Sequence, residues 1–240
     1  MRPRRQILVV VMGACIVSVG LCSSAIAVPI TVSFQQGVNG YGGTVDTSLN
    51  YGSNIPAGEL DRVLIDGSAE GSEPDDGLLQ FHDIFGNADG QIHLPAKILA
   101  VHLIIEVGGE SNDGATLHRV LQSWDETSTW VNSFGGNGVD TDNIEASSSV
   151  DCTVSGPPLG TLNLSDSGLV TTVQAWADGM PNHGWVFLTP SWDGWNFYSS
   201  EYLTVTNRPL LEVTYDVPEP HTISMVVVGA LALLRKRLGS

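Results

Sequence analysis

The sequence predicts an all-β protein with one β-sandwich domain, because turn signals and strand-length apolar segments alternate along most of the chain. Asp-Gly and Asn-Gly pairs recur between residues 28 and 217, and such pairs accept positive φ and close hairpins or tight loops. Between them lie short segments that are alternating or continuously apolar, at the regular spacing of a β-sandwich. These segments are 30–34, 63–65, 78–81, 98–107, 116–121, 185–188 and 210–215.

The domain is predicted to span residues 28–216 without an internal boundary. No low-complexity linker or repeat divides this region, and the chain of 240 residues is 42% apolar, which is enough for a packed core. Residues 98–107 predict a long central strand that is buried on both faces over part of its length. Only residues 169–177 show a helical pattern, and residues 140–149 are polar enough to predict a long loop. Folds with many helices, such as Rossmann folds and α/β barrels, are not supported by this pattern.

The N-terminal 27 residues have the organisation of a secretory signal peptide. An apolar run at 7–21 precedes small residues at Ala25 and Ala27, where signal peptidase would cleave. Three cations precede the run: Arg2, Arg4 and Arg5. A retained membrane helix is the alternative, but a span needs about 20 apolar residues. After cleavage the chain keeps Cys152 alone, so no intrachain disulfide can form.

The C-terminal segment 217–240 has three parts, a Pro-Glu-Pro motif, an apolar run at 223–234 and a basic end. The motif and the basic end consist of Pro218, Glu219, Pro220, Arg235, Lys236 and Arg237. This segment resembles the PEP-CTERM sorting signal. The resemblance implies that the exported protein is held transiently at the inner membrane until an exosortase acts near the motif. A basic end on the cytoplasmic side agrees with the positive-inside rule, although the apolar run is short for a span.

The region between these ends resembles the DNRLRE-type domain, a secreted β-sandwich grouped with carbohydrate-binding modules. The resemblance rests on the order and spacing of segments 34–47, 78–81, 92–103, 124–130, 173–179, 183–188, 197–201 and 208–215. It implies a jelly-roll fold and a polysaccharide ligand, with alginate among the ligand types of the family. The resemblance implies no catalytic residues, because the segments shared with the family are elements of the fold.

The segment around the Asp-Gly turn at residues 193–194 is the candidate carbohydrate site. Two tryptophans flank the turn and are expected to be at least partly exposed. Flat aromatic faces stack on sugar rings, while Asp and Asn side chains bind sugar hydroxyl groups. The candidate residues are Trp192, Asp193, Trp195, Asn196 and Tyr198. The alternative is a hairpin closed by packed aromatic side chains. Three further tryptophans are expected in the core instead: Trp124, Trp130 and Trp176.

The acidic loop at 140–143 is the candidate calcium site. Asp140, Asp142 and Asn143 supply alternating oxygen ligands of the kind that hard cations bind, but the full EF-hand pattern is absent, and a solvated acidic loop is the alternative. Calcium would also help an acidic protein to bind an anionic glycan by bridging the two.

The charge of the domain excludes one class of partner. Residues 28–217 contain four cations and 25 acidic residues, a net charge of −21 within a chain of net charge −16. Because nucleic acids and anionic lipids bind through Lys and Arg, nucleic-acid binding is excluded. The sequence also lacks the local motifs of metalloproteases, redox enzymes, α/β-hydrolases and nucleotide-binding proteins. It therefore predicts a non-catalytic polysaccharide-binding protein of the cell surface or extracellular matrix. The alternatives are a structural matrix protein without a specific glycan and a polysaccharide-degrading enzyme.

Overall fold

The computed structural model describes residues 28–68 and 73–217. The predicted signal peptide at 1–27 and the sorting motif and basic end beyond residue 217 lie outside the described residues. Within the described ranges, no helix is both long enough and apolar enough to cross a membrane.

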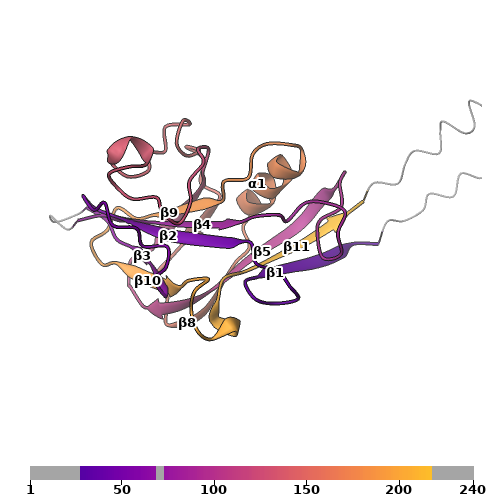
Figure 1. Cartoon of the computed structure of the whole chain (residues 1–240), viewed down its shortest axis with the longest axis horizontal. Coiled ribbons are helices and arrows are strands. Elements are labelled where there is room, and N and C mark those ends of the chain that lie inside the picture. The colour runs from indigo at the N-terminus through magenta and orange to yellow at the C-terminus, as the bar shows by residue number, and fades with distance from the viewer. Residues whose placement is uncertain (1–27, 69–72, 218–240) are drawn as a thin grey trace, which may run out of the picture.

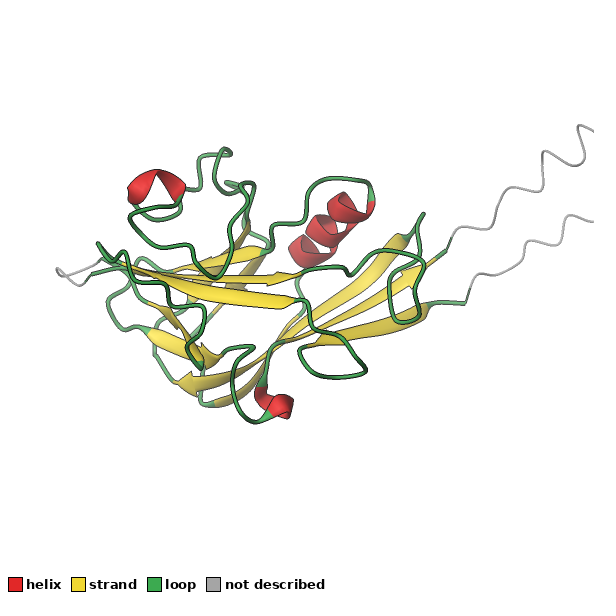
Figure 2. Ribbon diagram, viewed as in Figure 1, coloured by secondary structure: helices red, strands yellow, loops and turns green. Residues whose placement is uncertain are grey.

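Two antiparallel sheets make up the fold, as Figures 1 and 2 show. Sheet 1 contains β1 (Ile30–Gln35), β11 (Leu210–Asp216), β5 (Lys97–Gly109), β10 (Trp195–Tyr198) and β3 (Arg62–Ile65) in this order, and β8 (Gly160–Leu164) pairs with the other side of β5. Sheet 2 contains β2 (Thr44–Asn50), β4 (Asp75–Phe81), β9 (Trp185–Leu188), β6 (Ala115–Arg119) and β7 (Cys152–Val154). Among the residues that the structure describes, the helical elements are α1 (Ser167–Ala177) and the 3-10 turns η2 (Phe134–Gly136) and η3 (Val205–Asn207).

The strand order is that of a jelly roll. The series β1-β11-β5-β8 faces the series β4-β9-β6-β7, so that the chain repeatedly crosses from one sheet to the other. The remaining strands extend the sheets at their edges: β2 lies beside β4, and β10 and β3 continue sheet 1 beyond β11 along β5. The prediction of a single jelly-roll-like β-sandwich is therefore confirmed.

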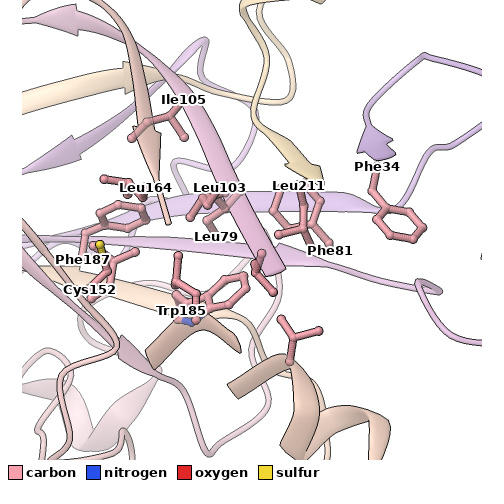
Figure 3. Packing of buried hydrophobic residues seen from close by; sticks show 14 of the residues in the cluster. Phe34, Leu79, Phe81, Leu103, Ile105, Cys152, Leu164, Trp185, Phe187 and Leu211 are labelled. Atoms are coloured by element: carbon pink, nitrogen blue, oxygen red, sulfur yellow. The ribbon is translucent and has the colours of Figure 1, made fainter. Parts of the chain in front are cut away.

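The main core lies between the two sheets. Alternate side chains of β5 point inward, and Leu103 and Ile105 are at most 1% exposed. They meet Leu79 of β4 and Trp185 of β9 from sheet 2, as Figure 3 shows. Helix α1 packs against β5 and contributes Trp176, whose ring centroid lies 4.7 Å from that of Trp185. The helix predicted at 169–177 is present and begins two residues earlier.

A second, smaller core covers the outer face of sheet 2. The irregular segment 120–151 folds over this face, and Leu78 of β4 contacts its buried side chains. The buried residues of this segment are Val120, Trp124, Trp130, Phe134, Val139 and Ala146. Trp124 and Trp130 are thus core residues, as the sequence predicted, and residues 140–149 form a loop.

No described segment covers the outer face of sheet 1 in this way. The outward side chains His102, Ile104 and Glu106 of β5 are half-exposed, whereas the sequence predicted burial on both faces over part of this strand. This prediction rested on the apolar run and was wrong, because Ile104 points outward into a face that is mainly polar. Of the two outer sheet faces, the face of sheet 1 is therefore the one open to a ligand.

Candidate ligand-binding surface

The structure separates the five predicted carbohydrate-binding residues into three environments. Trp192 is 56% exposed in the loop before β10, but Trp195 is only 3% exposed and packs against Phe187 and Phe197 in the core. The prediction that both tryptophans are exposed is therefore wrong for Trp195. The reason is that β10 begins at this residue, and the alternation of a strand turns Trp195 and Phe197 inward.

Asp193 stabilises its own loop. Its carboxylate accepts hydrogen bonds from Ser111 Oγ and from the backbone N–H of Asn112, both at 3.0 Å. These bonds tie the loop before β10 to the loop that follows β5. The Asp193 carboxylate therefore holds the turn on which Trp192 is presented.

Asn196 and Tyr198 point outward from β10 and form part of an aromatic surface on sheet 1. The ring of Tyr198 stacks on Tyr202, with 3.8 Å between the centroids and 23° between the planes. The Arg62 guanidinium lies over the Tyr198 ring, 5.0 Å from its centroid. Arg62 Nη1 also donates to Asn196 Oδ1 at 3.0 Å. We call Arg62, Asn196, Tyr198 and Tyr202 the tyrosine platform.

Two glycines at the end of β5 leave room for the side chains of the platform. A Cβ atom on Gly109 would clash with the Asn196 amide, and one on Gly108 would lie 3.0 Å from Arg62 Nη1. The carbonyl oxygen of Gly108 accepts a second hydrogen bond from Arg62 at 3.2 Å. The Gly-Gly pair at the end of β5 therefore lets the Arg62 and Asn196 side chains lie close to the strand.

The two tyrosine hydroxyl groups interact with each other. A hydrogen bond with the Tyr198 side chain raises the pKa of Tyr202 above its ordinary value, so the Tyr202 phenol stays neutral at physiological pH. The platform therefore carries one positive charge, on Arg62, and otherwise offers neutral aromatic and amide groups.

Polar pairs between neighbouring strands continue from the platform along the outer face of sheet 1. Each pair joins a hydroxyl, amide, imidazole or carboxylate group on one strand to a partner on the next. The pairs are Thr161 with Glu106, His102 with Asn163, Ser33 with Glu212 and Thr31 with Thr214. A hydroxylated ligand lying along β5 would therefore meet hydrogen-bonding groups over most of its length.

The three residues that the sequence predicted to bind calcium form hydrogen bonds within their own loop. Asp142 Oδ1 accepts from two backbone N–H groups at 2.7 and 3.1 Å, and these bonds lower the pKa of Asp142. Asn143 Oδ1 accepts from the Ser148 N–H at 2.9 Å, and Asp140 Oδ2 accepts from the Asn137 amide at 2.8 Å. In the part of the chain that the structure describes, no group of three His, Cys, Asp or Glu side chains is arranged to hold a metal ion. The structure therefore gives the predicted calcium site no support.

Cys152 lies in the main core as a free thiol. Burial, with a smaller contribution from the neighbouring Asp166, raises its pKa to about 12. The thiol is thus protonated and unreactive at neutral pH. Asp151, the residue before Cys152, accepts hydrogen bonds from Thr172 and Trp185.

Two buried carboxylates were not predicted from the sequence. Asp46 of β2 is 1% exposed and accepts a hydrogen bond from the Ser200 N–H at 2.8 Å. Burial, with the nearby charge of Glu201, raises the pKa of Asp46 well above its ordinary value. Asp76 of β4 lies beneath the segment that covers sheet 2, where burial raises its pKa to about 7. Neither position has a local sequence signal, because the groups that bury each carboxylate are distant in sequence.

No protein-family model matches the chain, and no curated protein matches it significantly. The protein is therefore defined by its fold and surface, as a jelly-roll β-sandwich with one covered sheet face and one open, polar sheet face that carries an aromatic platform.

Proposed function

We propose that this protein is an exported, non-catalytic polysaccharide-binding protein whose ligand lies across the outer face of sheet 1. The observation that carries the proposal is the stacked Tyr198–Tyr202 pair on the uncovered sheet face. A sugar ring has an apolar C–H face that stacks on an aromatic ring, and hydroxyl groups that pair with amide and carboxylate groups around its edge. The tyrosine platform and the polar pairs beyond it supply both kinds of contact.

The shape of this face favours a polymer over a single sugar. The polar pairs follow β5, a strand of 13 residues and therefore about 40 Å long. The platform lies at the end of β5 where Gly109 pairs with Asn196. A rigid sheet holds these groups in place before the ligand arrives, which lowers the entropy lost on binding.

The net charge of −21 over residues 28–217 favours a neutral polysaccharide. An anionic polymer would be repelled over most of the surface, except close to Arg62. Cations that bridge the negative charges of the polymer and the protein would be needed for such a polymer to bind along the rest of this face.

The export and sorting parts of the proposal rest on the sequence, and the geometry is compatible with them. β1 and β11 are antiparallel neighbours, with Ile30 opposite Tyr215, so the described chain begins and ends at the same end of the sandwich (Figure 1). Asp216 pairs with Lys97 at the start of β5, whereas the platform lies at the other end of that strand. A protein held at a membrane by residues 218–240 would therefore present the platform away from the membrane.

The test compares the full-length chain with a Tyr198→Ala, Tyr202→Ala double variant by affinity electrophoresis in gels that contain cellulose derivatives, xylan, mannan or alginate. We expect at least one neutral polysaccharide to retard the wild type, and the double variant to bind about tenfold more weakly, a change of about 1.4 kcal/mol. The matched control is Trp192→Ala, which removes an exposed aromatic side chain outside the platform.

Two results would contradict the proposal. Retardation by none of the polymers would favour a structural matrix protein without a specific glycan. Binding that survives the double tyrosine variant but is lost in Trp192→Ala would move the site to the loop before β10.

A further inference from the structure

A pocket lies beside β1, away from the platform. It shares Thr31 and Ser33 with the polar pairs of the proposed polymer surface, but the rest of its lining is not used by the proposed function. It is an open pocket of about 670 Å³ between β1, the turn at 38–43 and the loop at 83–91. This volume is within the range of small-molecule sites, about 300–1,000 Å³. Its wall at β1 is an edge strand that pairs with β11 on one side only.

The pocket has an aromatic wall whose geometry is fixed. Phe34 of β1 is buried, and Tyr41 packs against it edge to face, with 5.3 Å between the ring centroids and 62° between the planes. The Tyr41 hydroxyl donates to the carbonyl oxygen of His82 at 2.9 Å. Burial raises the pKa of Tyr41, so this hydroxyl stays protonated. A ligand would therefore meet a rigid apolar surface at one side of the pocket.

Three polar side chains that line the pocket are free to bind a ligand. Asn39, Asp83 and Asp89 are exposed, and their side chains make no hydrogen bond to any residue that the structure describes. In this they differ from Asp142, whose carboxylate is already bonded within its own loop. The lining thus combines an apolar wall with an amide and two carboxylates whose side chains have no hydrogen-bond partner among the described residues.

The charge and size of the pocket select the class of ligand. Among the lining residues are two carboxylates and no Lys, Arg or His, so a phosphate or a uronic acid would be repelled. A single cation with its water shell needs only a few water volumes of about 30 Å³ each, far less than this pocket offers. A neutral ligand rich in hydroxyl groups fits both constraints, because hydroxyl donors form strong hydrogen bonds to ionised carboxylates.

We propose that this pocket is a second carbohydrate site that takes a neutral saccharide, with a C–H face against Tyr41 and hydroxyl groups donating to Asp83 and Asp89. The site does not depend on the tyrosine platform. Because the pocket lies beside β1, it can hold one part of a glycan whose other part lies on the outer face of sheet 1. It can also hold a separate short glycan.

Gly42 provides a variant that blocks the pocket. A Cβ atom on Gly42 meets no other atom within 4 Å, and its φ lies outside the left-handed region, so a large side chain is compatible with the backbone. Gly42→Trp should fill the pocket mouth and leave the fold intact. The matched control is Asn87→Trp, which adds the same side chain at an exposed position of the neighbouring loop that does not line the pocket.

The experiment records amide NMR spectra of the full-length chain during titration with cellotetraose, mannotetraose and tetragalacturonate, with and without a chelator. We expect at least one neutral tetrasaccharide to shift the signals of Asn39 and Gly90, and the uronate not to. Gly42→Trp should weaken this binding at least tenfold, and Asn87→Trp should not. The Asp83→Asn, Asp89→Asn double variant keeps the shape of the pocket and removes its charge, and it should weaken saccharide binding severalfold. This variant is the second test if Gly42→Trp is unstable.

The proposal is overturned if neither neutral probe shifts the pocket signals, if Gly42→Trp binds as tightly as the wild type, or if the uronate binds equally well. Binding that disappears with the chelator would assign the carboxylates to a cation and also overturn it. The Tyr198→Ala, Tyr202→Ala variant separates the two sites, because it should leave the pocket signals unchanged while it weakens polymer binding at the platform about tenfold.

Discussion

The carboxylate of Asp76 accepts a hydrogen bond from the backbone N–H of Val139 at 2.8 Å, and this bond joins β4 to the segment that covers sheet 2. The contact is tight, because a Cβ atom on Gly138 would lie only 2.6 Å from Asp76 Oδ2. The carboxylate is buried in a mainly apolar layer beside Trp130. The cover of sheet 2 therefore depends on a group whose ionisation is unfavourable where it lies.

Stability should fall as the pH rises through the titration of Asp76. Desolvation, with the charge of Asp75, raises the pKa of Asp76 from 3.8 to about 7 in the folded protein. The native state therefore binds more protons than the unfolded state between about pH 4 and pH 7, and the contribution present below pH 4 is lost across this window. The loss is at most about 4 kcal/mol, because each tenfold difference in proton affinity between the two states corresponds to about 1.4 kcal/mol.

Asp76→Asn isolates this effect, because the amide oxygen can still accept from Val139 while the ionisable group is gone. Urea unfolding at pH 4, 5.5 and 7 should give a smaller decline in the free energy of unfolding for the variant than for the wild type. Equal slopes for the two proteins would show that Asp76 does not titrate in this window.

Asp46 should behave as a second destabilising carboxylate at neutral pH. Its pKa is raised by burial and by the charges of Glu201 and Glu126, while the Ser200 N–H holds it in place. Asp46→Asn keeps an acceptor for Ser200 and removes the charge, so we expect a higher free energy of unfolding at pH 8. Asp46→Leu should instead lose about 1–3 kcal/mol, since the Ser200 N–H is left without a partner. Thermal unfolding of the three proteins at pH 8 measures both changes, and a lower melting temperature for Asp46→Asn would contradict the prediction.

Local patterns were sufficient to predict the fold. The turn pairs and apolar segments predicted most of the strands, and the spacing of Val173 and Trp176 predicted the helix, because these signals lie within a few residues. The same patterns did not predict β2, β7, β8 and β10. The tyrosine platform depends instead on long-range pairing. Tyr198 meets Arg62 only because β10 pairs with β3, and Asn196 meets Gly109 because β10 also pairs with β5. The inward turn of Trp195 followed from the position at which β10 begins, and such strand boundaries are the least reliable part of a sequence-based prediction.

Asp142 should stabilise its loop without calcium. Its carboxylate already accepts hydrogen bonds from two backbone N–H groups in the turn that follows it. Asp142→Ala removes the oxygen that accepts both hydrogen bonds at an exposed position, and we expect the melting temperature to fall by a few degrees. The size of the fall should be the same in millimolar calcium and in excess chelator. A fall seen only in the presence of calcium would instead restore Asp140, Asp142 and Asn143 as ligands of the ion.

A single methyl group on Gly109 should weaken glycan binding without much change in stability. The Cβ atom of Gly109→Ala would push away the Asn196 amide, which receives the hydrogen bond from Arg62, and so disturb the edge of the platform. The strand itself should survive, because the backbone of Gly109 lies outside the left-handed region. We expect polysaccharide binding to fall severalfold while the melting temperature stays within a few degrees of the wild type. Asn87→Ala is the control, since Asn87 is exposed, lies away from the platform and does not line the pocket beside β1. Equal affinities for Gly109→Ala and Asn87→Ala in gels containing the same polymer would mean that Asn196 and Arg62 take no part in binding.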